Sequence, residues 1–153
     1  MTGPRILAVE SKCVETFKTH EAHFAPAYRQ VLHRLADATW RAEFDRLIED
    51  PRRYRFLDAA QLFKHYLGLR NQFPHRPITL AYLYWAPTNA ADVAPCAIHA
   101  AELREFASCM NDPRVQFVGM SYAQVWDDWS GEGRPGWLRE HVAALRQRFD
   151  LSI

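Results

Sequence analysis

The chain has 153 residues, of which 48% are hydrophobic and 24% charged, a composition typical of one folded domain rather than a disordered chain. Its formal net charge is only +1, so it lacks the strong basic charge by which many nucleic-acid-binding proteins are recognised. It shows neither the ~18-residue apolar run of a membrane span nor a secretory signal. The three widely spaced cysteines are expected to be reduced thiols in a cytoplasmic protein.

The first predicted element is a strand over Ile6–Cys13, which is apolar on both faces until Glu10. Such a strand is typical of a largely parallel sheet that is covered on both sides. A helical region then follows over Ala25–Ile48. Asp37 can cap a new helix within it, so we expect the region to divide there.

Helices and strands alternate through the rest of the chain. Asp58 can cap a helix over Asp58–Leu67, and Gly68 is placed to end it. The later elements are expected over Ile78–Trp85 (strand), Ile98–Met110 (helix), Val115–Met120 (strand), a short helix after Ser121, and Trp137–Phe149 (helix). Strands joined through helices usually pair in parallel. We therefore expect a single three-layer α/β/α domain over residues 1–153. Its three strands, near 6–13, 78–85 and 115–120, should lie side by side in chain order, all parallel or with only the last reversed.

Glu10-Ser11-Lys12 lies at the carboxyl end of the first predicted strand, where open α/β sheets bind ligands. Residues two apart on a strand point to the same face, so Glu10 and Lys12 should project together. A carboxylate can bind a divalent cation, and a lysine beside it can orient an attacking water or offset the charge of a phosphate. The alternative is a simple ion pair at the end of a strand.

Four segments follow one another along most of the chain: Glu10–Glu15, Leu57–Leu69, Leu80–Trp85 and Phe117–Tyr122. Together they resemble a bacterial group of the PD-(D/E)XK, or restriction-endonuclease-like, nuclease superfamily. The resemblance implies a three-layer domain that cleaves DNA with Mg²⁺ or Mn²⁺. It also implies that Glu10 binds the metal, that Lys12 attends the attacking water, and that Glu15 is an additional acidic contact.

The chain departs from the superfamily pattern near its start. The pattern has an Asp on a strand before Glu10, but residues 1–9 contain no acidic residue, so the N-terminal helix and strands of the fold have no counterpart here. One carboxylate makes a poor Mg²⁺ site, because this cation prefers several oxygens in octahedral geometry. Either the chain starts late, or the protein is inactive as it stands, or another chain supplies the missing ligand. A Gln-x-x-x-Tyr signal of the superfamily is displaced by one residue, since Gln61 is followed by His65 and then Tyr66.

Five further residues are candidates for supporting roles. Gln61 and Lys64 belong to the helix that should pack beside the Glu10 strand, so they could reach the site or a phosphate. Capping of the helix by Gln61 and simple solvation of Lys64 are the alternatives. Arg52, Arg53 and Arg55 form the densest basic cluster and are candidate DNA contacts, unless they belong to a solvated turn.

The sequence thus favours a metal-dependent DNA endonuclease, or part of one, with a non-catalytic relic or interaction module of the same fold as the alternative. Ile6–Cys13 would form a poorly protected sheet edge, because Arg5 is the only charge in it before Glu10. Exposed strand edges recruit further strands. A homodimer is therefore expected, unless the N-terminal arm or the Ala25–Ile48 helices cover the edge.

Overall fold

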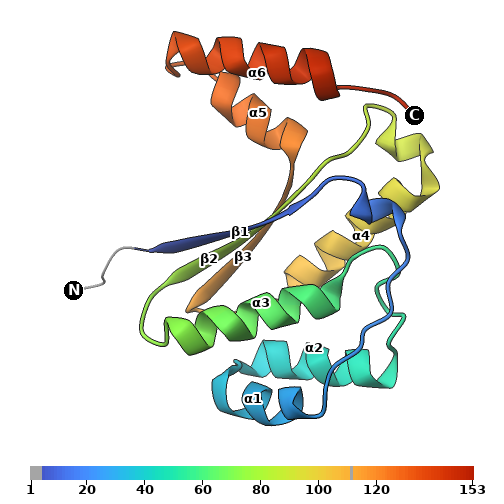
Figure 1. Ribbon diagram of the computed structural model, residues 1–153, viewed down its shortest axis with the longest axis vertical. Helices are drawn as coiled ribbons and strands as arrows, with labels where there is room; N and C mark the ends of the chain where they lie inside the picture. The colour runs from blue at the N-terminus through green and yellow to red at the C-terminus, as the bar shows by residue number, and fades with distance from the viewer. Residues whose placement is uncertain (1–4, 111) are drawn as a thin grey trace.

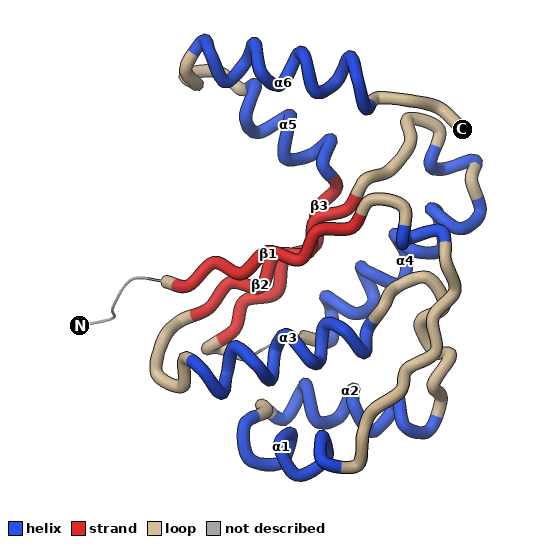
Figure 2. The backbone as a smooth tube through the Cα atoms, viewed as in Figure 1, coloured by secondary structure: helices blue, strands red, loops and turns tan. Residues whose placement is uncertain are grey.

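Three parallel strands form the centre of the computed structural model, which describes residues 5–110 and 112–153. They are β1 (Ile6–Lys12), β2 (Ile78–Tyr84) and β3 (Val115–Ser121), and they lie side by side in that order with both pairs parallel. The predicted strands, their order and their direction are confirmed. β1 lies at one edge of this sheet (Figure 2).

Helices lie on both sides of the sheet (Figure 1). The described helices are α1 (Ala27–Leu35), α2 (Ala38–Glu49), α3 (Ala59–Gln72), α4 (Ala94–Cys109), α5 (Tyr122–Ser130) and α6 (Gly136–Phe149). Short 3₁₀ turns occur at Glu15–Phe17 and Ala90–Asp92. In Figure 1, α1 to α4 lie below the sheet, whereas α5 and α6 lie above it. None of the helices in the described part of the chain is long and apolar enough to cross a membrane.

The main core lies between the sheet and the α1–α4 layer, and it is rich in aromatic rings. Trp40 from α2 stacks on Tyr66 from α3, with 3.8 Å between ring centroids and 4° between planes. Phe63 and Phe106 meet the same indole edge-on. Large buried rings contribute much of the hydrophobic stabilisation of a core, and edge-on and offset contacts add to it.

Two helix boundaries show where local signals were sufficient and where they were not. Asp37 caps α2 as predicted, because its carboxylate accepts a hydrogen bond from the backbone N–H of Thr39 at 2.9 Å. The prediction that Gly68 ends α3 is wrong, since the helix continues to Gln72. The additional turn buries Arg70, whose guanidinium donates to the carbonyl of Pro74 at 3.2 Å, so tertiary contacts outweigh the low helix propensity of glycine.

The two faces of the sheet are covered unequally. On β1, Glu10 and Lys12 face the α1–α4 layer and are buried, whereas Leu7 and Val9 on the opposite face are 67% and 52% exposed. The prediction of cover on both faces thus holds fully for one face and partly for the other. α1 and α2 pack beneath α3 in Figure 1 and leave Leu7 and Val9 uncovered. The N-terminal arm, the other expected cover, falls largely on residues 1–4, which lie outside the described residues.

Candidate active site

Glu10 and Lys12 project from β1 to the same buried face, as the strand periodicity predicted. The ammonium Nζ of Lys12 lies 2.9 Å from Oε1 of Glu10, and each side chain is 9% exposed. A buried charge pair is costly unless further hydrogen bonds satisfy its remaining donors and acceptors. These further partners come from α3.

Gln61 and His65 stand one helical turn apart on the face of α3 that meets β1. Lys12 donates from Nζ to Oε1 of Gln61 at 2.6 Å. Nδ1 of His65 lies 2.8 Å from Oε2 of Glu10, which leaves each carboxylate oxygen of Glu10 with its own cationic or N–H partner. The four side chains, Glu10, Lys12, Gln61 and His65, are called the β1–α3 cluster below.

Gln61 serves both of the roles considered for it. Its backbone N–H donates to the carboxylate of Asp58 at 3.0 Å, which caps α3, while its side chain reaches Lys12 in the cluster. Contacts with α4 also fix the position at which α3 begins. The buried Glu102 carboxylate of α4 accepts hydrogen bonds from three consecutive backbone N–H groups just before the helix, at Arg55, Phe56 and Leu57. This anchor sets the position from which Gln61 and His65 face β1.

His65 is the member of the cluster that the sequence did not single out. The displaced superfamily signal now has a structural explanation: four residues after Gln61 is the helical spacing, so His65 faces the site. Tyr66 instead turns into the core, where its hydroxyl donates to the buried carboxylate of Asp112 at 2.8 Å. Helical spacing from Gln61 was therefore the signal that could have identified His65.

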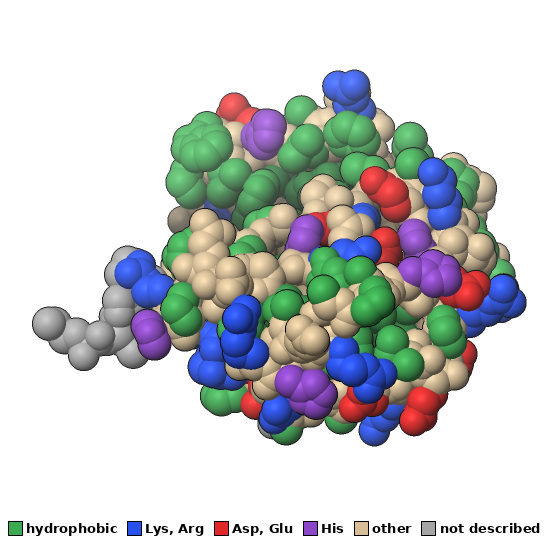
Figure 3. Space-filling model, turned by 60° about the horizontal axis from the view of Figure 1, so that its bottom comes forward, with side chains coloured by type: hydrophobic (Ala, Val, Ile, Leu, Met, Phe, Trp, Pro, Cys, Tyr) green, Lys and Arg blue, Asp and Glu red, His purple; other side chains and the backbone are tan. Residues whose placement is uncertain are grey.

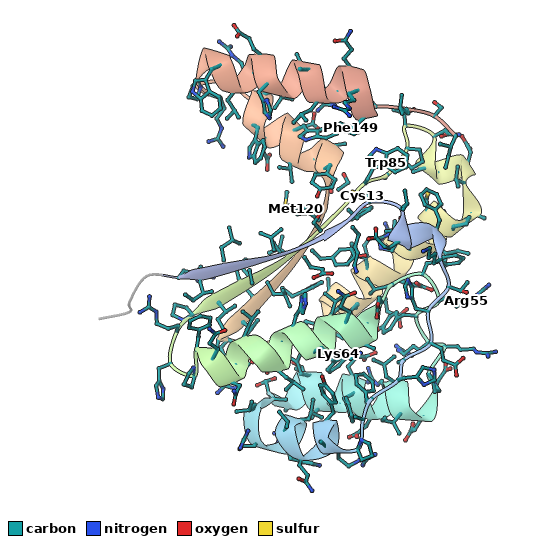
Figure 4. All side chains as sticks on the ribbon, in the orientation of Figure 1. Cys13, Arg55, Lys64, Trp85, Met120 and Phe149 are labelled. Atoms are coloured by element: carbon teal, nitrogen blue, oxygen red, sulfur yellow. The ribbon has the colours of Figure 1, made fainter. Side chains whose placement is uncertain are left out.

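Glu15 and Lys64 stand outside the cluster. The Glu15 carboxylate accepts a hydrogen bond from the backbone N–H of Cys13 at 2.8 Å, so it is turned toward its own loop. Hydrogen bonds from the backbone N–H groups of Glu15 and Cys13 lower the pKa of this carboxyl, and the nearby Lys12 charge lowers it further. Lys64 is exposed on α3 (Figure 4), and within the described part of the chain no hydrogen bond or ion pair links it to the cluster.

The side chains of β2 and α4 beside the Glu10–Lys12 pair are neutral. Tyr82 of β2 is the register partner of Glu10, and burial, together with the negative charge of Glu10, raises the pKa of its phenol. Its hydroxyl is hydrogen-bonded to Nε2 of His99 at 2.9 Å. Burial lowers the pKa of His99 to about 4, so this imidazole is uncharged near neutral pH. Neither group adds charge to the Glu10–Lys12 pair.

The arginine cluster is largely occupied by carboxylates. Arg53 pairs with the buried Glu43 at 2.9 Å and also with Glu105, and Arg52 pairs with Glu21 at 3.0 Å. The Arg55 side chain is exposed and lies over the ring of Phe56. Figure 3 shows basic and acidic side chains interspersed over the face of the molecule that it draws, without a continuous basic surface on that face.

The described residues do not form a complete site for Mg²⁺ or Mn²⁺. Glu10 is the only carboxylate in the β1–α3 cluster, and Lys12 and His65 already engage both of its oxygens. No group of three or more His, Cys, Asp or Glu side chains suited to a metal ion occurs in residues 5–110 and 112–153. Because a hard divalent cation needs several oxygen ligands, Glu10 fits as one ligand but not as the whole site.

The sequence as a whole matches one family of proteins, over residues 1–149. The description of that family is "Restriction Endonuclease associating with ARP", which agrees with the Glu-x-Lys strand, the parallel sheet and the flanking helices. No curated protein and no solved structure matches the chain. Because the match covers almost the entire sequence, the chain belongs to this restriction-endonuclease-like family.

Proposed function

We propose that this chain contributes the Glu10–Lys12 half of a DNA-cleaving site, and that a second carboxylate must join it before phosphodiester hydrolysis can occur. The proposal is supported by family membership, which indicates a nuclease-related role. The observation that carries it is the β1–α3 cluster, in which an acid and a lysine are buried and paired with each other at the end of β1, with one carboxylate only. In this proposal, Mg²⁺ or Mn²⁺ binds at the site only when the second carboxylate is present.

Each member of the cluster has a role in this proposal. Glu10 would be the chain's own cation ligand, held in place by Nδ1 of His65. Lys12 has three N–H donors, of which one lies on Glu10 and one on Gln61. The third can donate to a water molecule or a phosphate oxygen. Gln61 would thus be a positioning residue that fixes the direction of the ammonium.

Contacts to the DNA backbone are proposed for Arg52 and Arg55. The side-chain pair of Arg52 with Glu21 is exposed, and exposed ion pairs of this kind are weak and screened by salt, so a phosphate can replace the carboxylate. Arg55 is exposed as well. Arg53 is assigned a structural role instead, because it is bound by the buried Glu43.

Cleavage of supercoiled plasmid DNA in Mg²⁺ or Mn²⁺ tests the proposed function. The purified chain alone is expected to nick DNA no faster than its Glu10→Ala variant, since one carboxylate does not hold the cation. In an assembly that does cleave, Glu10→Ala should abolish activity. Lys12→Ala should lower the rate by about 100-fold or more, a typical loss for a group that stabilises the transition state.

The family description names an association with ARP, so an assembly with that partner is the first preparation to assay. Strong, Glu10-dependent cleavage by the chain alone would show that no second carboxylate is needed. Cleavage by an assembly that is indifferent to Glu10→Ala would remove Glu10 and Lys12 from the reaction.

A second candidate function, an interaction module, is favoured by the β1 edge. β1 has a paired neighbour on one side only within the described sheet, and Leu7 and Val9 beside this edge are exposed. Unpaired strand edges and exposed apolar side chains both favour association. We propose that two copies of the chain meet at this edge.

Light scattering at micromolar concentration is expected to give the mass of a dimer, and Val9→Lys is expected to give a monomer because it places a charge on the exposed face of the edge strand. Leu151→Lys is the matched control. Leu151 is 51% exposed, similar to Val9 at 52%, but lies in the C-terminal tail, so this variant should remain dimeric. A monomeric parent chain would refute the edge-to-edge dimer.

A further inference from the structure

A cavity of about 470 Å³ lies on the side of the sheet opposite the β1–α3 cluster. Its walls come from four separate parts of the chain: the end of β1, the end of β2, α5 and α6. Cys13, Trp85, Trp126 and Phe149 are among the lining side chains, and the lining is almost entirely apolar. Figure 4 shows Cys13, Trp85 and Phe149 close together between α6 and the ends of the strands, and Figure 3 shows hydrophobic side chains gathered beneath α6.

Hydrogen bonds tie the carboxyl end of α6 and the residues after it to the segment that follows β2. The indole Nε1 of Trp85 donates to the carbonyl of Phe149 at 2.9 Å. The backbone N–H of Thr88 donates to the carbonyl of Leu151 at 2.9 Å, and the side chain of Asn89 donates to the carbonyl of Ile153 at 2.6 Å. Three consecutive ties of this kind connect the segment after β2 to the end of the chain.

The α5 side of the cavity is fixed as well. Arg146 of α6 forms an ion pair with Asp127 of α5 at 2.6 Å, and its guanidinium lies over the ring of Trp126. The hydroxyls of Ser11 and Tyr122 are hydrogen-bonded at 2.5 Å, which joins β1 to the start of α5. These contacts join α6, α5 and the ends of β1 and β2 around the cavity.

The chemistry of the walls restricts what can fill this space. Ordered water needs two to four polar partners, which an apolar lining does not offer. A nucleobase would leave its polar edge without partners, at a large desolvation cost. A small hydrophobic molecule fits, because pockets of ~300–1,000 Å³ with apolar and aromatic walls are typical of small-molecule sites.

We propose that this cavity binds one uncharged, hydrophobic small molecule that carries an aromatic ring. Aromatic walls favour such a ligand, because rings pack against Trp85, Trp126 and Phe149 in edge-on or offset geometry. The site is separate from the β1–α3 cluster: side chains alternate along β1, so Glu10 and Lys12 point to one face and Ser11 to the other. The proposal does not depend on nuclease activity.

Fluorescence titration with N-phenyl-1-naphthylamine, a neutral aromatic probe, tests the proposal on the intact chain. Binding is expected to saturate at one probe per chain. Val125→Trp, which adds a large side chain to the cavity wall on α5, should weaken binding at least tenfold. Trp137→Ala is the matched control, because Trp137 is 68% exposed on α6 and does not line the cavity, and this variant should bind as the parent does.

Leu145→Trp, a second filling variant from α6, decides the question if Val125→Trp does not fold, as judged by circular dichroism. Binding that does not saturate, or that is unchanged in the folded filling variant, would overturn the proposal. A dimer that dissociates when the cavity is filled, and with which the probe competes, would instead identify a second copy of the chain as the occupant and would also overturn it.

Discussion

Replacing Glu43 with alanine is expected to lower the free energy of unfolding by about 2–4 kcal/mol, because the change leaves several groups without their buried partner. The side chain of Glu43 is fully buried and accepts a hydrogen bond from the hydroxyl of Tyr54 at 2.8 Å. It also pairs with Arg53 at 2.9 Å and Arg46 at 3.0 Å. Both arginines are partly exposed and can regain water, so most of the loss arises at the buried Tyr54 hydroxyl and from the space left behind.

Glu105→Ala provides the matched control for this prediction. Glu105 pairs with the same Arg53, but its side chain is 49% exposed, and exposed ion pairs contribute about 1 kcal/mol or less. Urea unfolding of the two variants and the parent measures the difference. Equal stability of Glu43→Ala and Glu105→Ala would show that the buried carboxylate contributes no more than the exposed one.

Much of the sheet and half of the β1–α3 cluster could be predicted because both depend on local patterns. Apolar runs separated by helices gave the three strands and their parallel order, and a spacing of two on β1 placed Glu10 and Lys12 on one face. The Asp37 cap could be predicted for the same reason, since a capping residue acts on the turn that follows it.

Long-range partners could not be predicted in this way. His65 meets Glu10, and Arg53 meets Glu43 and Glu105, only after separate elements have packed together. The basic run Arg52–Arg55, a candidate for DNA contacts in the sequence, is for this reason in part an internal ion-pair network. The exposure of Leu7 and Val9 could not be predicted either, because it depends on where distant helices pack. Both residues are apolar, but α5 and α6 lie near the other end of the sheet and do not cover them.

His65→Asp is expected to convert the β1–α3 cluster into a divalent cation site. An aspartate oxygen can occupy nearly the position of Nδ1, which lies 2.8 Å from Oε2 of Glu10. The variant would therefore place a second carboxylate beside the first. The amide oxygen of Gln61 lies nearby, because it accepts a hydrogen bond from the same Lys12 ammonium that pairs with Glu10. Cation affinity rises with the number and charge of oxygen ligands, so binding of Mn²⁺ should tighten at least tenfold.

Titration of the parent chain, His65→Asp and His65→Asn with Mn²⁺, followed by calorimetry, tests most directly the claim that this site lacks one carboxylate. His65→Asn has nearly the same shape as His65→Asp without the charge. We expect weak binding by the parent and by His65→Asn, and at least tenfold tighter binding by His65→Asp that is lost when Glu10→Ala is added. Micromolar Mn²⁺ binding by the parent chain, or no gain in His65→Asp, would show that a missing carboxylate does not limit the site.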